Sequence, residues 1–262
     1  MTATIQNRLE ALRAEMEKFN LDAWFISGTD PHSNEYLPDR WQTRAFITGF
    51  TGSYGMVVVT QNEVGLWTDS RYFIQAEEQL KDTGIAMNKL RVPDAIPPEI
   101  WLIQNLAKGN RVGIDAQSSS VAAFKNLQSC LFEKNIALVL TPDFLDNIWE
   151  NRPEIGVGEI FELDLEYSGV SRKDKQQNIV DKLQLVGADY HVVSMLDELA
   201  WLFNLRGSDI QFNPVFTGFG LIGKDTSYLF VDKVKLPDGL LWKLESEGIL
   251  VKDYNEFLKR SE

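Results

Sequence analysis

The chain has 262 residues, of which 44% are hydrophobic and 24% are charged, as is typical of a globular protein that buries a sizeable core. Its net charge of −12 argues against nucleic acid or an anionic membrane as the main partner. A single cysteine excludes an internal disulfide and fits a reducing compartment. No signal peptide and no apolar run of roughly 18 residues is visible, so we expect a cytoplasmic protein that does not enter a membrane.

The histidine content limits the chemistry further. Only two histidines are present, His32 and His191, and they lie far apart in the sequence. A dinuclear hydrolytic centre or a zinc site needs clustered histidine, carboxylate or thiolate ligands. The composition therefore predicts no self-contained transition-metal site on this chain.

Hydrophobic periodicity predicts an α/β domain with a mixed sheet in the first half of the chain. An amphipathic helix spanning 5–19 opens it, and 32–42 reads as a long ordered loop. The later predicted helices span 70–80, 97–107 and 121–131. The predicted strands span 23–26, 56–60, 64–68, 85–92, 111–115 and 136–140.

Three glycines, Gly49, Gly52 and Gly55, recur at a spacing of three before the strand at 56–60. Such a series could cradle a phosphate, but it lacks the Lys-Ser/Thr of a P-loop and the spacing of a dinucleotide loop. We interpret it as a tight turn into the next strand.

The stretch Gly65–Ile74 reads as a strand that runs directly into a helix. Asp69 is a good N-cap residue for a helix from about Ser70 to Leu80, which would place Arg71 in the first helical turn. The helix dipole disfavours a cation there, so Arg71 could hold an anionic group. The other reading, which the pattern alone favours, is a local pair of Arg71 with Asp69 or Glu77.

The stretch 151–158 has the Pro/Gly content of a linker and divides the chain into domains at 1–155 and 156–262. Ser171–Asp174 reads as a capping box that opens a helix with Ile179, Leu183 and Val186 inward. A second box, Ser194–Asp197, predicts a helix that ends at Gly207. The remaining predicted elements are strands at 190–193, 214–222, 228–231 and 249–252 and helices at 237–247 and 253–259.

The second half repeats the order of the first: helix, strand, loop, two strands, helix, strand, helix. The first half continues with a strand, a helix and a strand that the second half lacks. On this comparison we expect the second domain to be incomplete and the chain to be a fragment of a longer protein.

Several motifs resemble the N-terminal region of cytosolic three-domain Xaa-Pro aminopeptidases, which are relatives of creatinase and prolidase among the pita-bread metallopeptidases. The resemblance covers almost the whole chain. The motifs that carry it are Ser27-Gly-x-x-x-His32-x-x-Glu35-Tyr36, Arg44-Ala-Phe-x-x-Gly-Phe-x-Gly-Ser-x-Gly55, Trp67-Thr-Asp-x-Arg-Tyr-Phe73, Ile148-Trp-x-x-Arg-Pro-Glu154, Asp164-x-x-Tyr-Ser-Gly-Val-Ser171 and the long stretch from Asp197 to Phe216.

The resemblance implies two tandem ribonuclease-H-like, creatinase N-terminal-type domains, the second truncated. It implies a parent enzyme that removes the N-terminal residue from peptides with proline in second position. Two divalent metals, typically manganese, would lie in a C-terminal catalytic domain that is absent from this chain. The chain itself would carry no catalytic residue, metal ligand or cofactor. It would wall the active site, limit substrate length and contribute to the contacts of a homo-oligomer such as a dimer.

The resemblance also assigns candidate site residues. The arginine of the Trp-Thr-Asp-x-Arg-Tyr-Phe motif, Arg71, would bind the peptide substrate. His32, Tyr36 and Arg44 lie in matching loops and would shape them more than touch substrate. Tyr54 stands where a small residue is expected, so we expect the glycine turn to be shaped differently here.

Two further expectations concern the second half and the class of protein. We expect Arg206 and Asp209 to form a structural ion pair at a helix end. An alternative function is a catalytically inactive peptidase-like module that binds proteins or peptides, as in the large subunit of the FACT histone chaperone, since an acidic chain could hold basic partners. A metal-ligand constellation in the rest of the parent protein would favour the enzyme.

Overall fold

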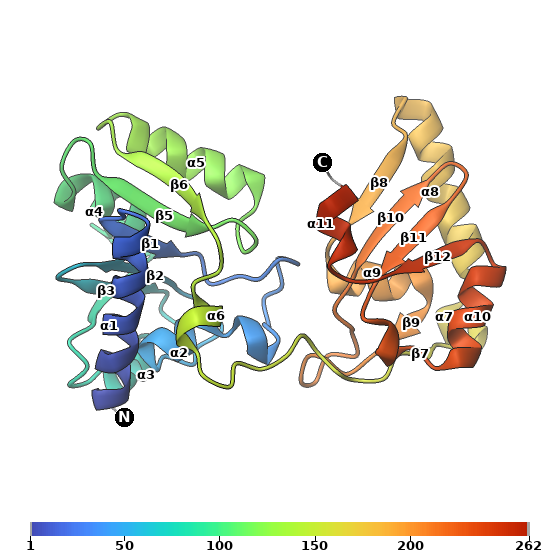
Figure 1. The fold of residues 1–262 in the computed structure, drawn as a ribbon, viewed down its shortest axis with the longest axis horizontal. Coiled ribbons are helices and arrows are strands. Elements are labelled where there is room, and N and C mark those ends of the chain that lie inside the picture. Colours follow the sequence, from blue (N-terminus) through green and yellow to red (C-terminus); the bar gives the residue numbers. More distant parts are fainter. Residues whose placement is uncertain (1, 261–262) are drawn as a thin grey trace. The chain divides into compact units, whose positions relative to one another are not determined.

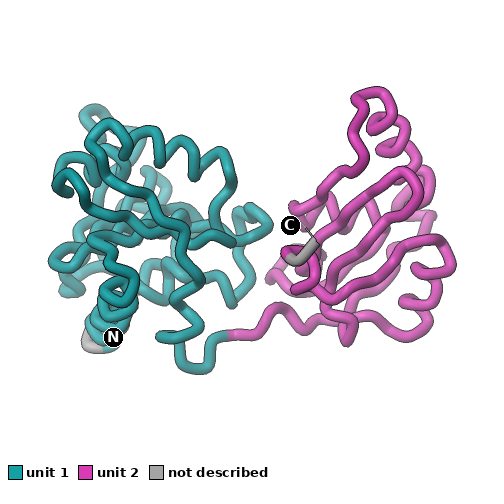
Figure 2. Tube along the Cα trace, turned by 45° about the horizontal axis from the view of Figure 1, so that its top comes forward, with its two compact units in different colours: residues 1–152 teal, residues 153–262 magenta. Residues whose placement is uncertain are grey.

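The structure, a computed structural model, describes residues 2–260. The chain divides into two compact units between Arg152 and Pro153 (Figure 2). This point lies within the Pro/Gly-rich stretch 151–158. Each unit has its own sheet and its own core.

Unit 1 is an α/β domain built around a six-stranded mixed sheet (Figure 1). Its helices are α1 (Thr2–Lys18), α2 (Thr43–Thr48), α3 (Phe73–Gln79), α4 (Pro98–Asn105), α5 (Val121–Phe132) and α6 (Leu145–Ile148). Its strands are β1 (Ala23–Ile26), β2 (Met56–Thr60), β3 (Val64–Thr68), β4 (Ala86–Lys89), β5 (Arg111–Asp115) and β6 (Ala137–Thr141). A 3-10 turn at Asp39–Trp41 interrupts the loop after β1.

The strand order in unit 1 is β4-β3-β2-β1-β5-β6. Strand β2 is antiparallel to both β1 and β3, whereas β4 runs parallel to β3, and β5 runs parallel to β1 and β6. The parallel pairing of β3 with β4 places Thr68 opposite Lys89. The segments that follow these two strands therefore leave the sheet at the same edge.

Helices cover both faces of this sheet, which is why β1 is buried along its whole length. On one face, Trp24 and Ile26 join apolar side chains of α1, α3 and α6 in one core cluster. On the other face, Ala23 and Phe25 pack with side chains of α4 and α5. The alternation of neighbouring residues between the two clusters follows from the two-residue period of a strand.

Unit 2 is a smaller α/β domain with a four-stranded sheet in the order β12-β11-β10-β8. Its helices are α7 (Leu165–Ser168), α8 (Arg172–Val186), α9 (Leu196–Phe203), α10 (Asp238–Ser246) and α11 (Glu256–Arg260). Its strands are β7 (Phe161–Glu162), β8 (Tyr190–Val193), β9 (Leu205–Arg206), β10 (Phe219–Gly223), β11 (Ser227–Phe230) and β12 (Ile249–Lys252), of which β7 and β9 form a separate pair. A 3-10 turn spans Lys233–Lys235.

The main sheet of unit 2 repeats the pairing of the first four strands of unit 1. Strand β10 is antiparallel to β8 and β11, and β12 is parallel to β11. This matches β2 with its neighbours β1 and β3, and β4 with β3. Within residues 2–260 no strand pairs with the outer edge of β8, the position that β5 occupies beside β1. The predicted repeat of element order is therefore present in three dimensions.

The predicted ends and buried faces of the helices in unit 2 agree with the structure only in part. Ser171 caps α8 as predicted, since its hydroxyl accepts the backbone N–H of Asp174 at 3.1 Å. In α9, Met195 occupies the N-cap position and its side chain makes no capping bond. The helix also ends earlier than predicted, because Asn204 adopts the left-handed conformation with φ of 51°. Val186, predicted to face inward, is 75% exposed.

Candidate functional site

The segment between β3 and α3 holds Arg71 in a turn. Helix α3 begins at Phe73, so Arg71 precedes the helix and the predicted clash with the helix dipole is absent. Asp69 does not cap the helix either. It accepts the backbone N–H of Arg71 at 3.2 Å and closes the turn. The local pair with Asp69, the second of the two readings, is the geometry that forms.

The Asp69 carboxylate fixes the orientation of the Arg71 guanidinium. Nε of Arg71 lies 3.0 Å from Oδ1 and Nη2 lies 3.0 Å from Oδ2, so the contact is bidentate. The hydrogen bond from Arg71 lowers the pKa of Asp69, and the same bond raises the pKa of Arg71. The Asp69 side chain is 3% exposed, whereas that of Arg71 is 51% exposed. A buried carboxylate thus positions a guanidinium whose other edge faces solvent.

Aromatic rings and the loop after β1 surround this guanidinium. The Arg71 guanidinium carbon lies 5.6 Å from the centre of the Tyr54 ring and 5.2 Å from that of Tyr72, within cation–π range. The Tyr72 hydroxyl is hydrogen-bonded to that of Ser53 at 2.7 Å. Nη1 of Arg71 lies 3.9 Å from a carboxylate oxygen of Glu35, in the loop predicted to be ordered. The arrangement suits recognition of a polar or anionic group by the solvent-facing N–H groups.

Arg44 lies beneath the glycine turn. It is 3% exposed and donates to the backbone carbonyls of Gly52 and Gly55, the latter at 2.9 Å. Burial lowers its pKa to about 10. A Cβ added at Gly28 would come within 2.8 Å of the Arg44 guanidinium and 2.1 Å of the Gly55 oxygen, so only glycine allows this close packing. Arg44 therefore holds the loop together and is withdrawn from solvent.

The other two candidates occupy contrasting positions in the loop after β1. His32 is fully buried, its backbone N–H donates to Asp30 at 3.0 Å, and its ring lies edge-on to Trp41. Tyr36 is 60% exposed. Asp30 also accepts two hydrogen bonds from Asn34, so this buried carboxylate organises the loop.

Sequence reasoning missed Arg91, which follows β4 and lies beside Arg71. Its Nη1 is 3.6 Å from the Asp69 carboxylate, and its guanidinium carbon is 5.4 Å from the centre of the Tyr54 ring. Twenty residues separate the two arginines in the sequence. The predicted strand at 85–92 was the available signal, because parallel pairing with the strand at 64–68 would bring their ends together.

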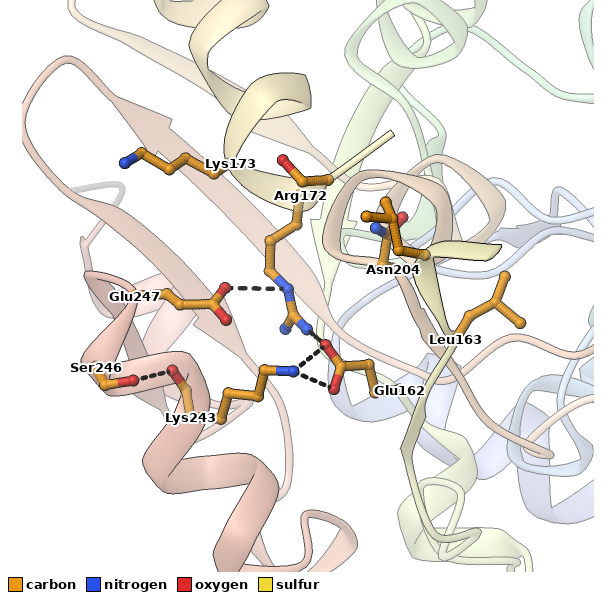
Figure 3. A pocket seen from close by; sticks show the side chains of 10 residues that line it. Glu162, Leu163, Arg172, Lys173, Asn204, Lys243, Ser246 and Glu247 are labelled. Atoms are coloured by element: carbon orange, nitrogen blue, oxygen red, sulfur yellow. Dashed lines mark hydrogen bonds and ion pairs between the residues drawn. The ribbon is translucent and has the colours of Figure 1, made fainter. Parts of the chain in front are cut away.

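Unit 2 has a cavity of about 540 Å³, and charged side chains make up half of its lining residues (Figure 3). Arg172 contacts Glu162, and its Nε lies 3.2 Å from Glu247, while Lys243 lies 2.7 Å from Glu162. Figure 3 shows the Arg172 guanidinium between the two carboxylates. Burial lowers the pKa of Arg172. These opposite charges compensate one another and tie α8 to β7 and the end of α10.

Residues 2–260 contain no group of three or more histidine, cysteine, aspartate or glutamate side chains arranged to hold a metal ion. The same residues form no helix that is long and apolar enough to cross a membrane.

Comparison with known proteins places both units in one family. Residues 8–147 and residues 151–262 each match a Creatinase/Prolidase N-terminal domain family. Xaa-Pro aminopeptidase 1 of Dictyostelium discoideum is 37% identical over 98% of this chain, and Aminopeptidase P1 of Arabidopsis thaliana is 34% identical over 95% of it. The chain covers 43% and 39% of these two relatives.

A solved structure agrees with these matches. The X-prolyl aminopeptidase of Caenorhabditis elegans, described as a cytosolic enzyme with a di-nuclear active site, superposes with a TM-score of 0.92 at 31% identity. The match covers 97% of this chain and 43% of that protein. The chain thus spans about 40% of the length of the relatives it matches. It belongs to the creatinase/prolidase N-terminal domain family, of which it carries two domains in tandem.

Proposed function

We propose that this chain is the non-catalytic N-terminal region of a metal-dependent Xaa-Pro aminopeptidase, and that Arg71 contacts the peptide substrate. The observation that carries the proposal is the Arg71 guanidinium, which a buried carboxylate holds by one edge while half of the side chain stays exposed. A guanidinium that is already held in place loses little conformational entropy when a ligand binds.

The chain's own residues would bind and orient the substrate. The solvent-facing N–H groups of Arg71 can donate to a peptide carbonyl or carboxylate, and Tyr54 and Tyr72 limit the directions in which the guanidinium can turn. The reacting carbonyl belongs to the substrate, and the residues that hold any metals would lie in the rest of the parent protein.

Kinetics of the full-length protein that contains this chain test the proposal. We expect Arg71→Ala to lower kcat/KM for an Xaa-Pro peptide in the presence of manganese by roughly 10- to 100-fold, as expected for loss of one charge-assisted hydrogen bond. Arg71→Lys, which keeps the charge without the planar fork, should recover part of the loss. Lys108→Ala, an exposed residue of the same unit, is the matched control.

The outcomes separate the enzyme from the alternative of a binding module. The 262-residue chain alone should show no peptidase activity. An inactive full-length protein would overturn the enzyme proposal and favour a module that holds basic proteins or peptides. Equal activity of wild type and Arg71→Ala would remove the arginine's role while leaving the enzyme proposal in place.

We also propose a cytosolic homo-oligomer, by analogy with the C. elegans relative for the compartment. The outer edge of β8 supports association between copies. Its side chains Tyr190 and Val192 are 56% and 53% exposed, and an open strand edge with apolar side chains favours strand pairing. Sedimentation velocity checks the assembly, and a monomer at high protein concentration would contradict it.

A further inference from the structure

Arg91 reaches the Arg71 site because of how β3 and β4 pair. The two strands are parallel, and the N–H of Leu90 donates to the carbonyl of Thr68 at 2.8 Å, which extends the pairing to the sheet edge. The residues that follow β3 and those that follow β4 therefore lie side by side at the same end of the sheet. One segment carries Asp69 and Arg71, and the other carries Arg91.

The two arginines share the same two partners. Both guanidiniums contact the Asp69 carboxylate, Arg71 at 3.0 Å and Arg91 at 3.6 Å. Both also lie over the ring of Tyr54, at 5.6 and 5.4 Å from its centre. Asp69 and Tyr54 thus form a common base that holds two cations side by side.

Only one of the two carboxylates at this site is buried. Two guanidiniums face one buried carboxylate, and the next carboxylate, Glu35, is 3.9 Å from Arg71 and 61% exposed in a loop. The Arg71 and Arg91 side chains are 51% and 71% exposed, so several of their N–H donors face solvent. Two neighbouring guanidiniums that share one buried carboxylate and keep further N–H donors toward solvent are suited to a carboxylate, which accepts paired N–H donors.

The backbone at Arg91 adds a separate indication. Its φ is +58°, in the left-handed region that favours glycine and disfavours a long side chain. Such backbone conformations tend to occur at binding sites, where surrounding contacts maintain them. Glycine would adopt this backbone conformation without strain, so Arg91→Gly removes the guanidinium without straining the turn.

We propose that Arg91 is a specificity-determining residue, and that Arg91 and Arg71 form a clamp for a carboxylate carried by the peptide substrate. The inference rests on the proposed role of Arg71 in substrate binding and names the chemistry that it recognises. The carboxylate belongs either to the C-terminus of a short peptide or to an acidic side chain after the proline. Peptides that lack both should lose the contribution of Arg91.

NMR spectroscopy of the 262-residue chain tests the clamp directly. The Nε–Hε signals of arginine are followed while Ala-Pro-Ala is added at constant ionic strength, with its C-terminus free or amidated. A second pair, amidated Ala-Pro-Glu and Ala-Pro-Gln, tests an acidic side chain. The Arg71 and Arg91 signals should shift together with a carboxylate-bearing peptide and much less with its neutral partner. Equal shifts with the charged and neutral peptides would overturn the clamp.

Variants separate binding from structure. Arg91→Gly removes the cation and suits the backbone, so it should weaken binding of the charged peptide at least about threefold while leaving Tm unchanged or higher. Arg91→Lys should recover part of the binding. Lys108→Gln makes the same charge change at an exposed position and should have no effect. Reduced Tm with unaltered binding in Arg91→Gly would show a structural role and overturn the proposal.

The clamp and the proposed function can fail separately. If the Arg71 signal responds to peptide and the Arg91 signal does not, the clamp is wrong and the substrate role of Arg71 remains. In the full-length protein, Arg91→Gly should raise KM for peptides with a free carboxylate and leave kcat and the amidated peptides unaffected. A full-length protein without peptidase activity, combined with a carboxylate-dependent NMR response, would refute the enzyme and retain the clamp.

Discussion

Lys235 and Asp209 form an ion pair that is almost fully withdrawn from solvent, with side chains 1% and 0% exposed. Asp209 also accepts the backbone N–H groups of Gly158 and Thr217, at 3.2 and 2.6 Å. The expected pair of Asp209 with Arg206 is wrong, because Arg206 instead donates to backbone carbonyls of α9 and β9. Asp209 therefore joins the first residues of unit 2, the loop before β10 and the 3-10 turn after β11.

This buried pair makes Lys235 critical for the stability of unit 2. Burial lowers the pKa of Lys235, while the charge of Asp209 opposes the change. We expect Lys235→Met to lower the free energy of unfolding by about 3–5 kcal/mol, because the Asp209 charge stays buried without its cation. Hydrogen exchange of the β10 and β11 amides measures the loss. Lys233→Met, an exposed lysine in the same turn, should change it by less than about 0.5 kcal/mol. Equal effects of the two variants would contradict the argument.

Arg44→Lys tests the support of the glycine turn. A lysine cannot donate to the Gly52 and Gly55 carbonyls as the arginine fork does, so one buried carbonyl would lose its partner. We expect a loss of about 1–3 kcal/mol in the stability of unit 1, seen as faster exchange of the β2 and β3 amides. Arg111→Lys serves as the control, since this exposed arginine donates to a single carbonyl, that of Asn20. A stable Arg44→Lys variant would show that the turn holds its shape unaided.

Asp115 predicts a pH dependence of stability in unit 1. Burial raises its pKa above the ordinary value of 3.8, although Ser118 and Gln117 donate hydrogen bonds to it. The folded state therefore binds this proton more readily than the unfolded state. Its contribution to stability is present below pH 3.8 and is lost as pH rises through the folded pKa.

The variant Asp115→Asn removes this titration. The free energy of unfolding of the variant minus that of wild type should be larger at pH 7 than at pH 4. Urea unfolding of both proteins at the two pH values measures this difference. Asp39→Asn, at an exposed aspartate of the same unit, should show no such difference between the two pH values. A stability difference for Asp115→Asn that is the same at both pH values would rule out the raised pKa.

Ser171→Ala tests the capping box of α8. Loss of the side-chain acceptor for the N–H of Asp174 should cost about 1 kcal/mol in the stability of unit 2. Ser246→Ala, which removes an exposed hydroxyl from the last turn of α10, should cost close to nothing. Thermal unfolding of the two variants gives the comparison, and similar Tm values would indicate that water replaces the cap.

Part of the candidate site could be predicted from local sequence. The motif around Arg71 identified the arginine, and Asp69 was among its predicted partners. The position of the α3 start could not be predicted, because Asp69 can cap a helix or close a turn with the same carboxylate. Arg91 was not predicted, because it lies beside Arg71 only as a result of the pairing of β3 with β4.

The sequence by itself determined the strands of the two main sheets, most helices and the repeated order of elements, because apolar periodicity and helix caps act over a few residues. Only the tertiary structure decided that Asp209 pairs with Lys235 instead of Arg206, and that Arg71 and Arg91 share Asp69 and Tyr54. Which distant charges meet depends on strand register and on which carboxylate is buried. A buried carboxylate such as Asp209 is costly without a cation beside it, so it pairs with the cation that the fold brings next to it. No local sequence pattern encodes which cation that is.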